Sequence, residues 1–282
     1  MSEVWTILKV LTWTKEYLAG KGVENARLEA EWMLCAALGT DRVGLYVNYD
    51  KPLTSAELNG FRGMVGRRAK REPLQYILGS QDFFGLDFEV TPGVLIPRHD
   101  TETLVREALA RAPDGATILD IGVGSGCIAV ALAKNLPGAE VSGVDPSPRA
   151  LALAERNAHR HQVSLNLLCG SLFEPVKGRR FDLVVSNPPY IPAADLAGLQ
   201  PEVRDYEPRE ALDGGSDGLE FYRRIIPDAA AHLNTGGWLL VEMGIGQARD
   251  VLALLEKSGG FAEVFTAMDP GGIERVAGGR AR

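Results

Sequence analysis

The sequence predicts an α/β protein whose mostly parallel, seven-stranded sheet carries helices on both faces and follows a small helical bundle and a β-hairpin. Three observations lead to this fold. Strands and helices alternate from Asp100 onward, as they do where helices join parallel strands. Residues 1–72 repeat apolar positions at helical spacing only. Residues 73–98 combine aromatic and alternating apolar positions around a turn, which indicates a hairpin.

The first 72 residues are expected to form four short helices. Apolar residues recur at helical spacing over residues 4–18, and glycines follow as a stop signal. Further helices are expected over residues 25–38, just after Thr40, and over residues 54–71. Helices this short are marginally stable alone, so we expect the bundle to pack on another part of the protein.

The chain after Asp100 is expected to form the sheet. Its apolar runs are short and separated by helical segments, so most strands should be parallel, with a ligand site at their carboxyl ends. Strands are expected over residues 117–121, 140–144, 165–168, 182–186, 238–243, 262–266 and 273–277. Helices are expected over residues 128–135, 149–161, 219–233 and 247–257.

The charge distribution disfavours nucleic acid as a direct target. The net charge is −7, and residues 1–75 hold 11 Lys and Arg against 9 Asp and Glu, so the remainder is acidic. An acidic domain argues against binding that depends on phosphate neutralisation. The basic run Arg67–Arg71 can contact RNA or an acidic protein surface, but such a run is more often the solvated end of a helix.

Cysteines, histidines and the amino terminus argue against several other classes. Cys35, Cys127 and Cys169 lie far apart, so we expect three reduced, buried thiols. The histidines lack the spacing of a metal site, and no metal is predicted. The amino terminus does not have the pattern of a signal peptide, and no apolar run reaches the length of about 18 residues that indicates a membrane helix. A cytoplasmic location is therefore expected.

A glycine-rich turn, Gly122-Val123-Gly124-Ser125-Gly126, follows the first expected strand of the sheet. Glycines let the backbone pass close to a ligand, and the helix behind them presents free N–H groups. Cys127 stands where a dinucleotide fingerprint needs its third glycine, which disfavours NAD. The spacing indicates a different nucleoside cofactor.

Asp145 closes the second expected strand and sharpens this prediction. A carboxylate at this place can accept hydrogen bonds from both ribose hydroxyls of an adenosine. With the glycine turn, it favours S-adenosyl-L-methionine, which becomes S-adenosyl-L-homocysteine when its methyl group is transferred. The alternative is that Asp145 only caps the helix that begins after Pro146.

The most specific segment is Asn187-Pro188-Pro189-Tyr190, at the end of the fourth expected strand. Prolines cannot donate backbone hydrogen bonds and have a fixed φ, so their carbonyl groups point in a pre-set direction. Asn187 adds a side-chain carbonyl acceptor, and Tyr190 adds a flat ring. The alternative is that this segment simply ends the strand and begins a loop.

Such acceptors suit an amide or nucleobase amino group, a poor nucleophile that carries two N–H donors. Asn187 and the Pro188 carbonyl can hold both protons and orient the nitrogen toward the methyl group. The same carbonyl dipoles stabilise the positive charge that develops on the nitrogen. No side-chain base is needed before transfer. We therefore predict Asn187, Pro188 and Tyr190 as catalytic residues.

Further segments are similar to those of one protein family. They are Pro73–Gly79, Val94–Glu102 with its Ile-Pro-Arg core, Asn187–Tyr190, Tyr206–Pro208, Ala211–Gly215 and Asp217–Leu219. With these segments and its helical amino-terminal part, the chain resembles the release factor glutamine N5-methyltransferases, the PrmC/HemK family, over nearly its whole length.

The resemblance implies a class I S-adenosylmethionine-dependent methyltransferase. The methyl acceptor would be the glutamine of the Gly-Gly-Gln loop of peptide chain release factors, in translation termination. The implied domains are a helical substrate-recognition domain (1–72), a hairpin linker (73–98) and a catalytic domain (99–282). The implied cofactor residues are Gly122, Val123, Gly124, Ser125, Gly126, Asp145, Leu172 and Asn187. The implied substrate residues are Asn187, Pro188, Pro189 and Tyr190.

The chain departs from the family pattern at His99, Val123, Pro146 and Ser171, where Pro, Thr, an aliphatic residue and an acid are usual. Three rival functions remain open. A sister family methylates a glutamine of a ribosomal protein, although Arg98–Glu102 favours the release-factor branch. A nucleobase amino-methyltransferase would need a basic recognition region. A non-catalytic binding protein would not need an intact site.

Overall fold

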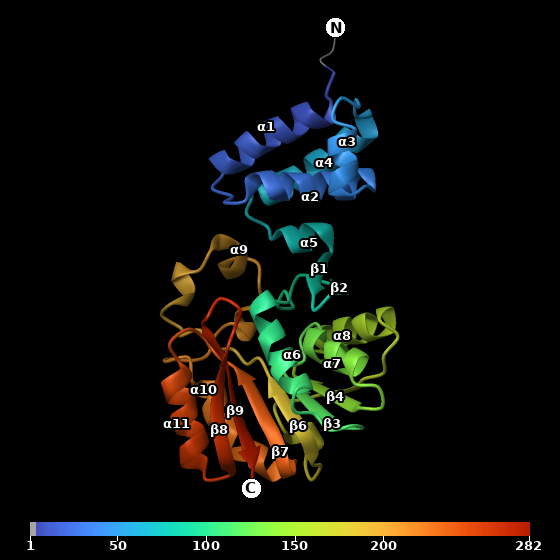
Figure 1. Ribbon diagram of the computed structural model, residues 1–282. Helices are drawn as coiled ribbons and strands as arrows, with labels where there is room; N and C mark the ends of the chain where they lie inside the picture. The colour runs from blue at the N-terminus through green and yellow to red at the C-terminus, as the bar shows by residue number, and fades with distance from the viewer. Residues whose placement is uncertain (1–3) are drawn as a thin grey trace. The chain divides into compact units, whose positions relative to one another are not determined.

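The computed structural model describes residues 4–282 (Figure 1). The chain divides into two compact units. The amino-terminal unit comprises the described chain up to Gly79 together with Pro201–Tyr206, and the carboxyl-terminal unit comprises Ser80–Gln200 and Glu207–Arg282. None of the helices in residues 4–282 is long and apolar enough to cross a membrane.

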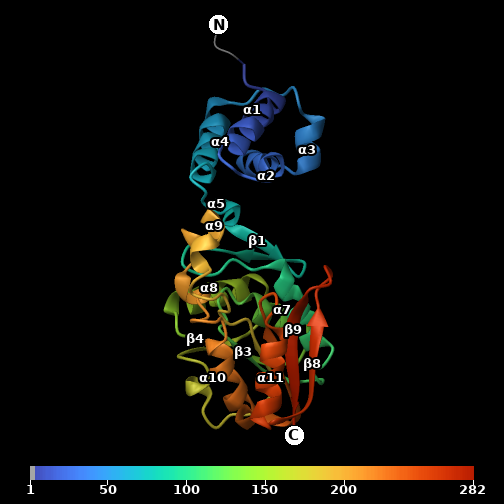
Figure 2. The same ribbon diagram turned by 90° about the vertical axis from the view of Figure 1, so that its left-hand side faces the viewer.

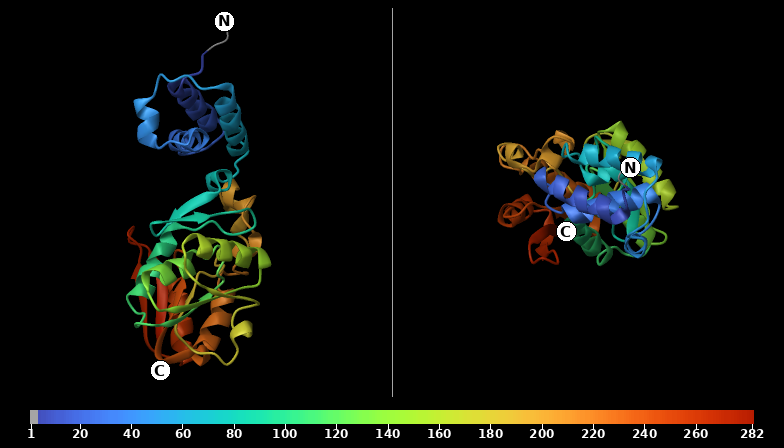
Figure 3. Two further views of the ribbon diagram at one scale, coloured as in Figure 1. Left: turned by 90° about the vertical axis from the view of Figure 1, so that its right-hand side faces the viewer. Right: turned by 90° about the horizontal axis from the view of Figure 1, so that it is seen from above.

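The amino-terminal unit is helical, and Figure 2 and Figure 3 show its bundle from further sides. Its four predicted helices are confirmed, and two short helices, α5 and α9, add to them. The elements are α1 (Ile7–Gly20), α2 (Ala26–Leu38), α3 (Arg42–Val47), α4 (Ser55–Arg68), α5 (Leu74–Leu78) and α9 (Pro201–Arg204). Thr54 caps α4 in a reciprocal capping box with Glu57. Ile7, Leu34 and Phe61 are among the buried residues of the core.

The basic run at the end of α4 is not a freely solvated helix end. Arg68 is only 4% exposed. Its guanidinium pairs with Glu29 and, at 2.7 Å, with Glu202. Arg71 also pairs with Glu202 at 2.7 Å. The expected solvated end is therefore wrong for Arg68, because its charge is used inside the amino-terminal unit.

The hairpin consists of β1 (Ser80–Phe83) and β2 (Leu86–Glu89), which pair antiparallel. Phe84 and Gly85 turn the chain with φ of 52° and 72°. Positive φ at both central residues matches the twist of a tight hairpin. The predicted hairpin is confirmed, and it belongs to the carboxyl-terminal unit.

The carboxyl-terminal unit contains a seven-stranded sheet in the order β5-β4-β3-β6-β7-β9-β8. β9 pairs antiparallel with β7 and β8, and the other pairs are parallel. The strands are β3 (Thr117–Ile121), β4 (Glu140–Asp145), β5 (Asn166–Cys169), β6 (Phe181–Ser186), β7 (Leu233–Glu242), β8 (Phe261–Met268) and β9 (Glu274–Ala281). The helices are α6 (Glu102–Leu109), α7 (Cys127–Asn135), α8 (Pro148–Arg160), α10 (Glu220–Ala229) and α11 (Ala248–Ser258). Short 3-10 helices are η1 (His99–Thr101), η2 (Glu174–Val176), η3 (Leu196–Gly198), η4 (Arg209–Ala211) and η5 (Ala230–His232).

Helices cover both faces of this sheet, as predicted. α6, α7 and α8 lie on one face, and α10 and α11 lie on the other (Figure 1). The alternation of β6 explains the two layers. Leu183 and Val185 join the buried cluster of α6, α7 and α8, whereas Val184 joins the cluster of α10 and α11.

Two of the differences from the sequence-based expectations concern the start of β7 and the burial of Cys169. β7 begins at Leu233 rather than Trp238, because Leu233 pairs with Phe181 across a register shift that the turn-like residues after Leu233 conceal. Cys35 and Cys127 are buried, but Cys169 is exposed, so the prediction of three buried thiols is wrong for Cys169. Cys169 ends β5, which lies at the edge of the sheet.

Candidate active site

The predicted ligand-binding residues follow three neighbouring strands. Ile121 of β3 stands in register with Val144 of β4 and with Ser186 of β6. The next residues along these strands therefore lie at one edge of the sheet. The strand order reverses its direction between β3 and β6, so this edge is the switch point at which open α/β sheets bind ligands.

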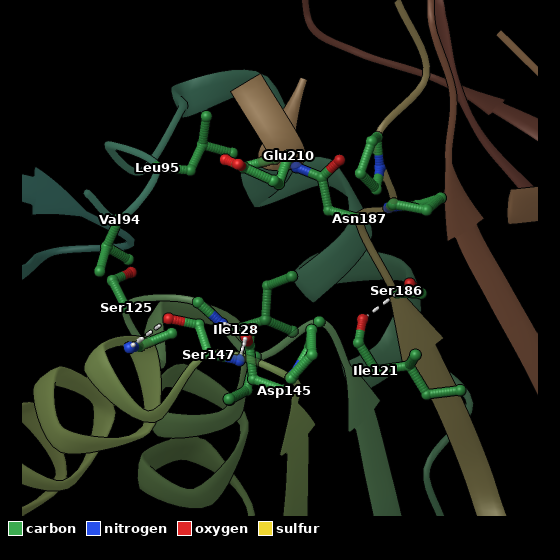
Figure 4. A pocket seen from close by; sticks show the side chains of 18 of the residues that line it. Val94, Leu95, Ile121, Ser125, Ile128, Asp145, Ser147, Ser186, Asn187 and Glu210 are labelled. Atoms are coloured by element: carbon green, nitrogen blue, oxygen red, sulfur yellow. Dashed lines mark hydrogen bonds between the residues drawn. The ribbon is translucent and has the colours of Figure 1, made fainter. Parts of the chain in front are cut away.

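A cavity of about 440 Å³ opens at this edge. Figure 4 shows Asp145 and Asn187 at the ends of different strands with the cavity between them. Its lining includes Gly122, Val123, Gly124, Ser125, Asp145, Leu172, Asn187, Pro188 and Pro189. Two predicted residues, Gly126 and Tyr190, are not among those that line it.

The glycine turn takes backbone conformations that side chains disfavour. Gly122, Gly124 and Gly126 have φ of 76°, 54° and 82°. A Cβ atom added at Gly122 would meet nothing within 4 Å, whereas one at Gly126 would lie 3.0 Å from Ala154 Cβ. Gly122 thus borders open space, and Gly126 lets α7 and α8 approach each other.

Asp145 is 8% exposed, and both of its carboxylate oxygens face backbone donors. Oδ2 accepts from Gly124 N and Oδ1 from Ser147 N, each at 2.9 Å. Burial raises the pKa of this carboxyl group, and the two backbone bonds oppose the shift. Ser147, not Asp145, caps α8. Each oxygen keeps a lone pair for a further donor.

Leu172 and Ser171 lie on another wall of the cavity. Leu172 has φ of 50°, a left-handed conformation that is uncommon for a residue with a branched side chain. Ser171 Oγ accepts from Arg224 Nη2 at 3.3 Å. The wall at this position therefore offers a hydroxyl group held by Arg224.

One end of the Asn187 amide is held by Thr101, another residue that lines the cavity. Its Nδ2 donates to Thr101 Oγ1 at 3.1 Å. The Oδ1 atom is thereby the end left for a ligand. No backbone N–H in the described part of the chain donates to the Pro188 carbonyl group. The wall therefore presents two acceptors from adjacent residues.

Tyr190 is half-buried, and its hydroxyl group lies 3.5 Å from Glu242 Oε1. Two glycines pack against its backbone. A Cβ atom at Gly214 would lie 2.8 Å from Tyr190 C, and one at Gly218 would lie 2.4 Å from Tyr190 O. Gln247 Nε2 also donates to the Tyr190 carbonyl at 3.0 Å. The segment around Gly214 and Gly218 thus supports the loop that carries Asn187–Tyr190.

Arg98 and Glu207 form an ion pair beside the cavity, which Arg98 lines. Glu207 is 6% exposed and also accepts from Ile96 N at 3.1 Å. Ion pairs at the surface contribute little to stability, but this pair is not at the surface. Because Glu207 is buried, the pair instead fixes the Ile-Pro-Arg segment against the loop after Asn187–Tyr190.

Two further carboxyl groups at this edge have no counterpart in the sequence-based predictions. Asp120 and Glu242 are 0% and 1% exposed. Burial raises the pKa of each to about 7. The sequence feature that could have revealed them is a single acidic residue inside an apolar strand or at its end. Within residues 4–282, no cluster of His, Cys, Asp and Glu side chains is arranged to hold a metal ion.

Comparisons with known proteins agree with this organisation. The family model described as PrmC N-terminal domain matches residues 9–79, and that described as Methyltransferase small domain matches residues 99–197. The release factor glutamine methyltransferase of Geobacter sulfurreducens is 69% identical over 99% of this chain and 98% of its own. That of Chlorobaculum tepidum is 41% identical over 97% of this chain and 96% of its own.

Solved structures share the fold over most of this chain. A 16S rRNA methyltransferase of T. thermophilus, in complex with AdoMet and guanosine, aligns with a TM-score of 0.52 and 21% identity, over 72% of this chain and 50% of its own. A methyltransferase of Pyrococcus furiosus aligns with a TM-score of 0.51 and 21% identity, over 70% of this chain and 89% of its own. The predicted class I fold is thereby confirmed.

Proposed function

This chain belongs to the release factor glutamine methyltransferase family, and on that basis we propose that it methylates peptide chain release factors. The methyl group of S-adenosyl-L-methionine would pass to the N5 amide nitrogen of the glutamine in their Gly-Gly-Gln loop. The enzyme would act in the cytoplasm, where translation ends.

The cavity fits the proposed cofactor. Its volume of about 440 Å³ lies within the range of roughly 300–1,000 Å³ that is usual for ligand sites. The open space beyond Gly122 admits a ligand against the backbone, and Asp145 offers acceptors to the ribose hydroxyls. When bound, S-adenosyl-L-methionine supplies an electrophilic methyl group on its sulfonium.

The observation that carries the substrate assignment is the pair of acceptors at Asn187 and Pro188. Because Asn187 Nδ2 donates to Thr101, Oδ1 is the end of the amide left for a ligand, and the Pro188 carbonyl belongs to the next residue of the same wall. A primary amide brings two N–H donors, one for each acceptor. This arrangement holds the nitrogen in place and stabilises the charge that develops on it.

The helical domain over residues 1–72 would recognise the body of the release factor. Its surface exposes Trp13 and Trp32, which are 49% and 43% accessible. Trp13 stacks on Tyr17 with 4.9 Å between ring centroids. Large exposed aromatic rings are typical of protein-binding surfaces. Replacing Trp13 and Trp32 by Ala should raise KM for the intact factor and leave KM for a short Gly-Gly-Gln peptide unchanged.

A methyl-transfer assay tests the proposed function. Labelled S-adenosyl-L-methionine and the purified protein are offered a release factor, its Gln→Ala loop variant, ribosomal proteins and DNA. Label on the intact factor, lost in the loop variant, is the expected result. Label on a ribosomal protein or on DNA would overturn the substrate assignment and leave the cofactor assignment standing.

A further inference from the structure

Glu242, the last residue of β7, is a buried carboxyl group close to the Asn187–Tyr190 segment. It is 1% exposed, and its Oε1 lies 3.5 Å from the Tyr190 hydroxyl. Its Oε2 has no hydrogen-bond partner among residues 4–282. Glu242 is not among the residues that line the cavity, so any effect on a substrate passes through its neighbours.

Thr101 connects Glu242 to Asn187. Its side chain is 2% exposed, and its hydroxyl group is near enough to the Glu242 carboxyl group to lower the pKa of that group. Its Oγ1 accepts from Asn187 Nδ2 at 3.1 Å. An ionised carboxylate has no proton, so in a hydrogen bond between these two groups the Thr101 hydroxyl is the donor. The Oγ1 lone pairs then accept from Asn187, and the NH2 group is the only part of the Asn187 amide that can donate.

We infer that Glu242 and Thr101 are positioning residues that set which end of the Asn187 amide faces the substrate. The inference rests on the proposed function, because an amide substrate needs the Oδ1 end. An Asn amide fits its pocket in two orientations that differ by exchange of oxygen and nitrogen. With the NH2 end outward, Asn187 would meet the substrate NH2 donor to donor.

The orientation of the Asn187 amide can reverse when Glu242 is protonated. A protonated carboxyl group can donate to Thr101, and the Thr101 hydroxyl is then free to donate to Asn187 Oδ1. Burial raises the pKa of Glu242 to about 7, so the reversal falls near neutral pH. We therefore expect kcat to rise with pH through about 7.

Other charged and titratable groups act on Glu242. Arg275 lowers its pKa and Asp100 raises it. Tyr222 donates from its hydroxyl to the Glu242 carbonyl at 2.8 Å. Burial raises the pKa of the nearby Cys127 thiol to about 12 and that of Tyr190 well above its usual range. These groups therefore keep one protonation state near pH 7. The pKa of Asp120 is also about 7, so loss of the pH dependence in Glu242→Gln is what assigns the titration to Glu242.

Kinetics of three variants test the inference. Thr101→Val and Glu242→Gln should each lower kcat about tenfold or more, the expected effect of losing one buried hydrogen bond in a network. Thr101→Ser keeps the hydroxyl and should keep kcat within about threefold. The Kd for S-adenosyl-L-methionine should stay unchanged in all three. The rise of kcat near pH 7 should disappear in Glu242→Gln.

Asp182→Asn is the matched control, since Asp182 is a carboxyl group at the opposite end of the sheet. It should keep the wild-type kcat and pH profile. Wild-type kinetics in Thr101→Val or Glu242→Gln would overturn the inference. A thermal midpoint lower in Glu242→Gln than in the wild type at pH 8, with a parallel loss of cofactor binding, would instead indicate a merely structural role and would also overturn it.

A measurement without substrate separates this inference from the proposed function. The ¹⁵N-labelled side-chain NH2 signals of Asn187 report its partner, and Asn187→Ala identifies them. In the wild type they should shift with a midpoint near pH 7, and in Glu242→Gln they should not. If the Asn187 NH2 signals of the wild type do not shift with pH, the positioning role is overturned. Failure of methyl transfer to the release factor would overturn only the proposed function.

Discussion

The carboxyl groups at the two ends of the parallel sheet have opposite pKa shifts. At the amino end, Asp182 accepts from Thr117 N at 2.9 Å, from Thr117 Oγ1 at 2.8 Å and from Asn234 Nδ2 at 2.7 Å. These bonds hold its pKa below the usual value despite the opposing effect of burial. At the carboxyl end, burial raises the pKa of Asp120 and Glu242 to about 7.

The comparison shows which end is built for stability and which for chemistry. Asp182 is satisfied by the protein itself, so its charge contributes to folding. Glu242 keeps an oxygen without a hydrogen-bond partner among residues 4–282. Acceptors that the fold leaves incompletely satisfied destabilise it, and such groups concentrate at functional sites.

The largest expected effect separates two asparagines, one at each end. Asn187→Ala should lower kcat by about 10²–10³, the usual loss when one group that stabilises developing charge is removed. The Kd for S-adenosyl-L-methionine should change little. Asn234→Ala should leave kcat unchanged and lower the free energy of unfolding by about 1 kcal/mol. Single-turnover kinetics and calorimetry measure both, and equal kcat for the two variants would contradict the comparison.

A smaller effect is expected for cofactor binding. Asp145→Asn should weaken the Kd for S-adenosyl-L-methionine about 10- to 100-fold, because a charged acceptor contributes about 1.5–3 kcal/mol. kcat at saturating cofactor should stay near the wild-type value. Asp182→Asn, the same change at the amino end, should leave this Kd unchanged. Titration calorimetry that finds no loss for Asp145→Asn would show that Asp145 only orders the turn through Gly124 and Ser147.

The smallest expected effect is on the free energy of unfolding. Replacing Glu242 at the carboxyl end of the sheet and Asp182 at the amino end should change it in opposite directions at pH 8. The pKa of Glu242 in the folded protein is raised from its usual 4.5 to about 7. Its contribution to the free energy of unfolding is therefore fully present below about pH 4.5 and lost as pH rises to about 7. At pH 8, Glu242→Gln should be as stable as the wild type or more stable, by at most about 3 kcal/mol.

The contribution of Asp182 to the free energy of unfolding has the opposite pH dependence. Its pKa is lowered in the folded protein, so its contribution is present above the usual 3.8 and is lost as pH falls below that value. Asp182→Asn should therefore be less stable than the wild type at pH 8. Thermal unfolding of both variants across pH measures the difference, and a shift of the same sign in both would contradict it.

Local sequence was sufficient to predict much of the fold. Periodicity and stop signals placed α1, α2 and most strands within a few residues of their observed bounds. The glycine turn and Asn187–Tyr190 were found because each is a contiguous segment with unusual backbone chemistry. α6 was not predicted, although Leu104, Val105 and Ala108 are buried at helical spacing.

The residues that support the site were beyond the reach of local patterns. Thr101, Glu242 and Arg275 come from η1, β7 and β9, and only the sheet topology brings them together. In the sequence, Glu242 is a single acidic residue that follows an apolar run. Tyr190 was predicted as a platform for the substrate, but its hydroxyl faces Glu242 and its ring is half-buried. Its contact with a substrate remains a prediction.

The account's central claim is that Asn187 and Pro188 recognise an amide by its two N–H donors. The most direct test compares methyl transfer to an intact release factor with transfer to its Gln→Glu loop variant, which has the same shape and no amide protons. We predict that the Glu variant receives no methyl group and competes weakly with the Gln form, because two acceptors then face a carboxylate. Methylation of the Glu variant at a comparable rate, or equal competition by it, would contradict the account.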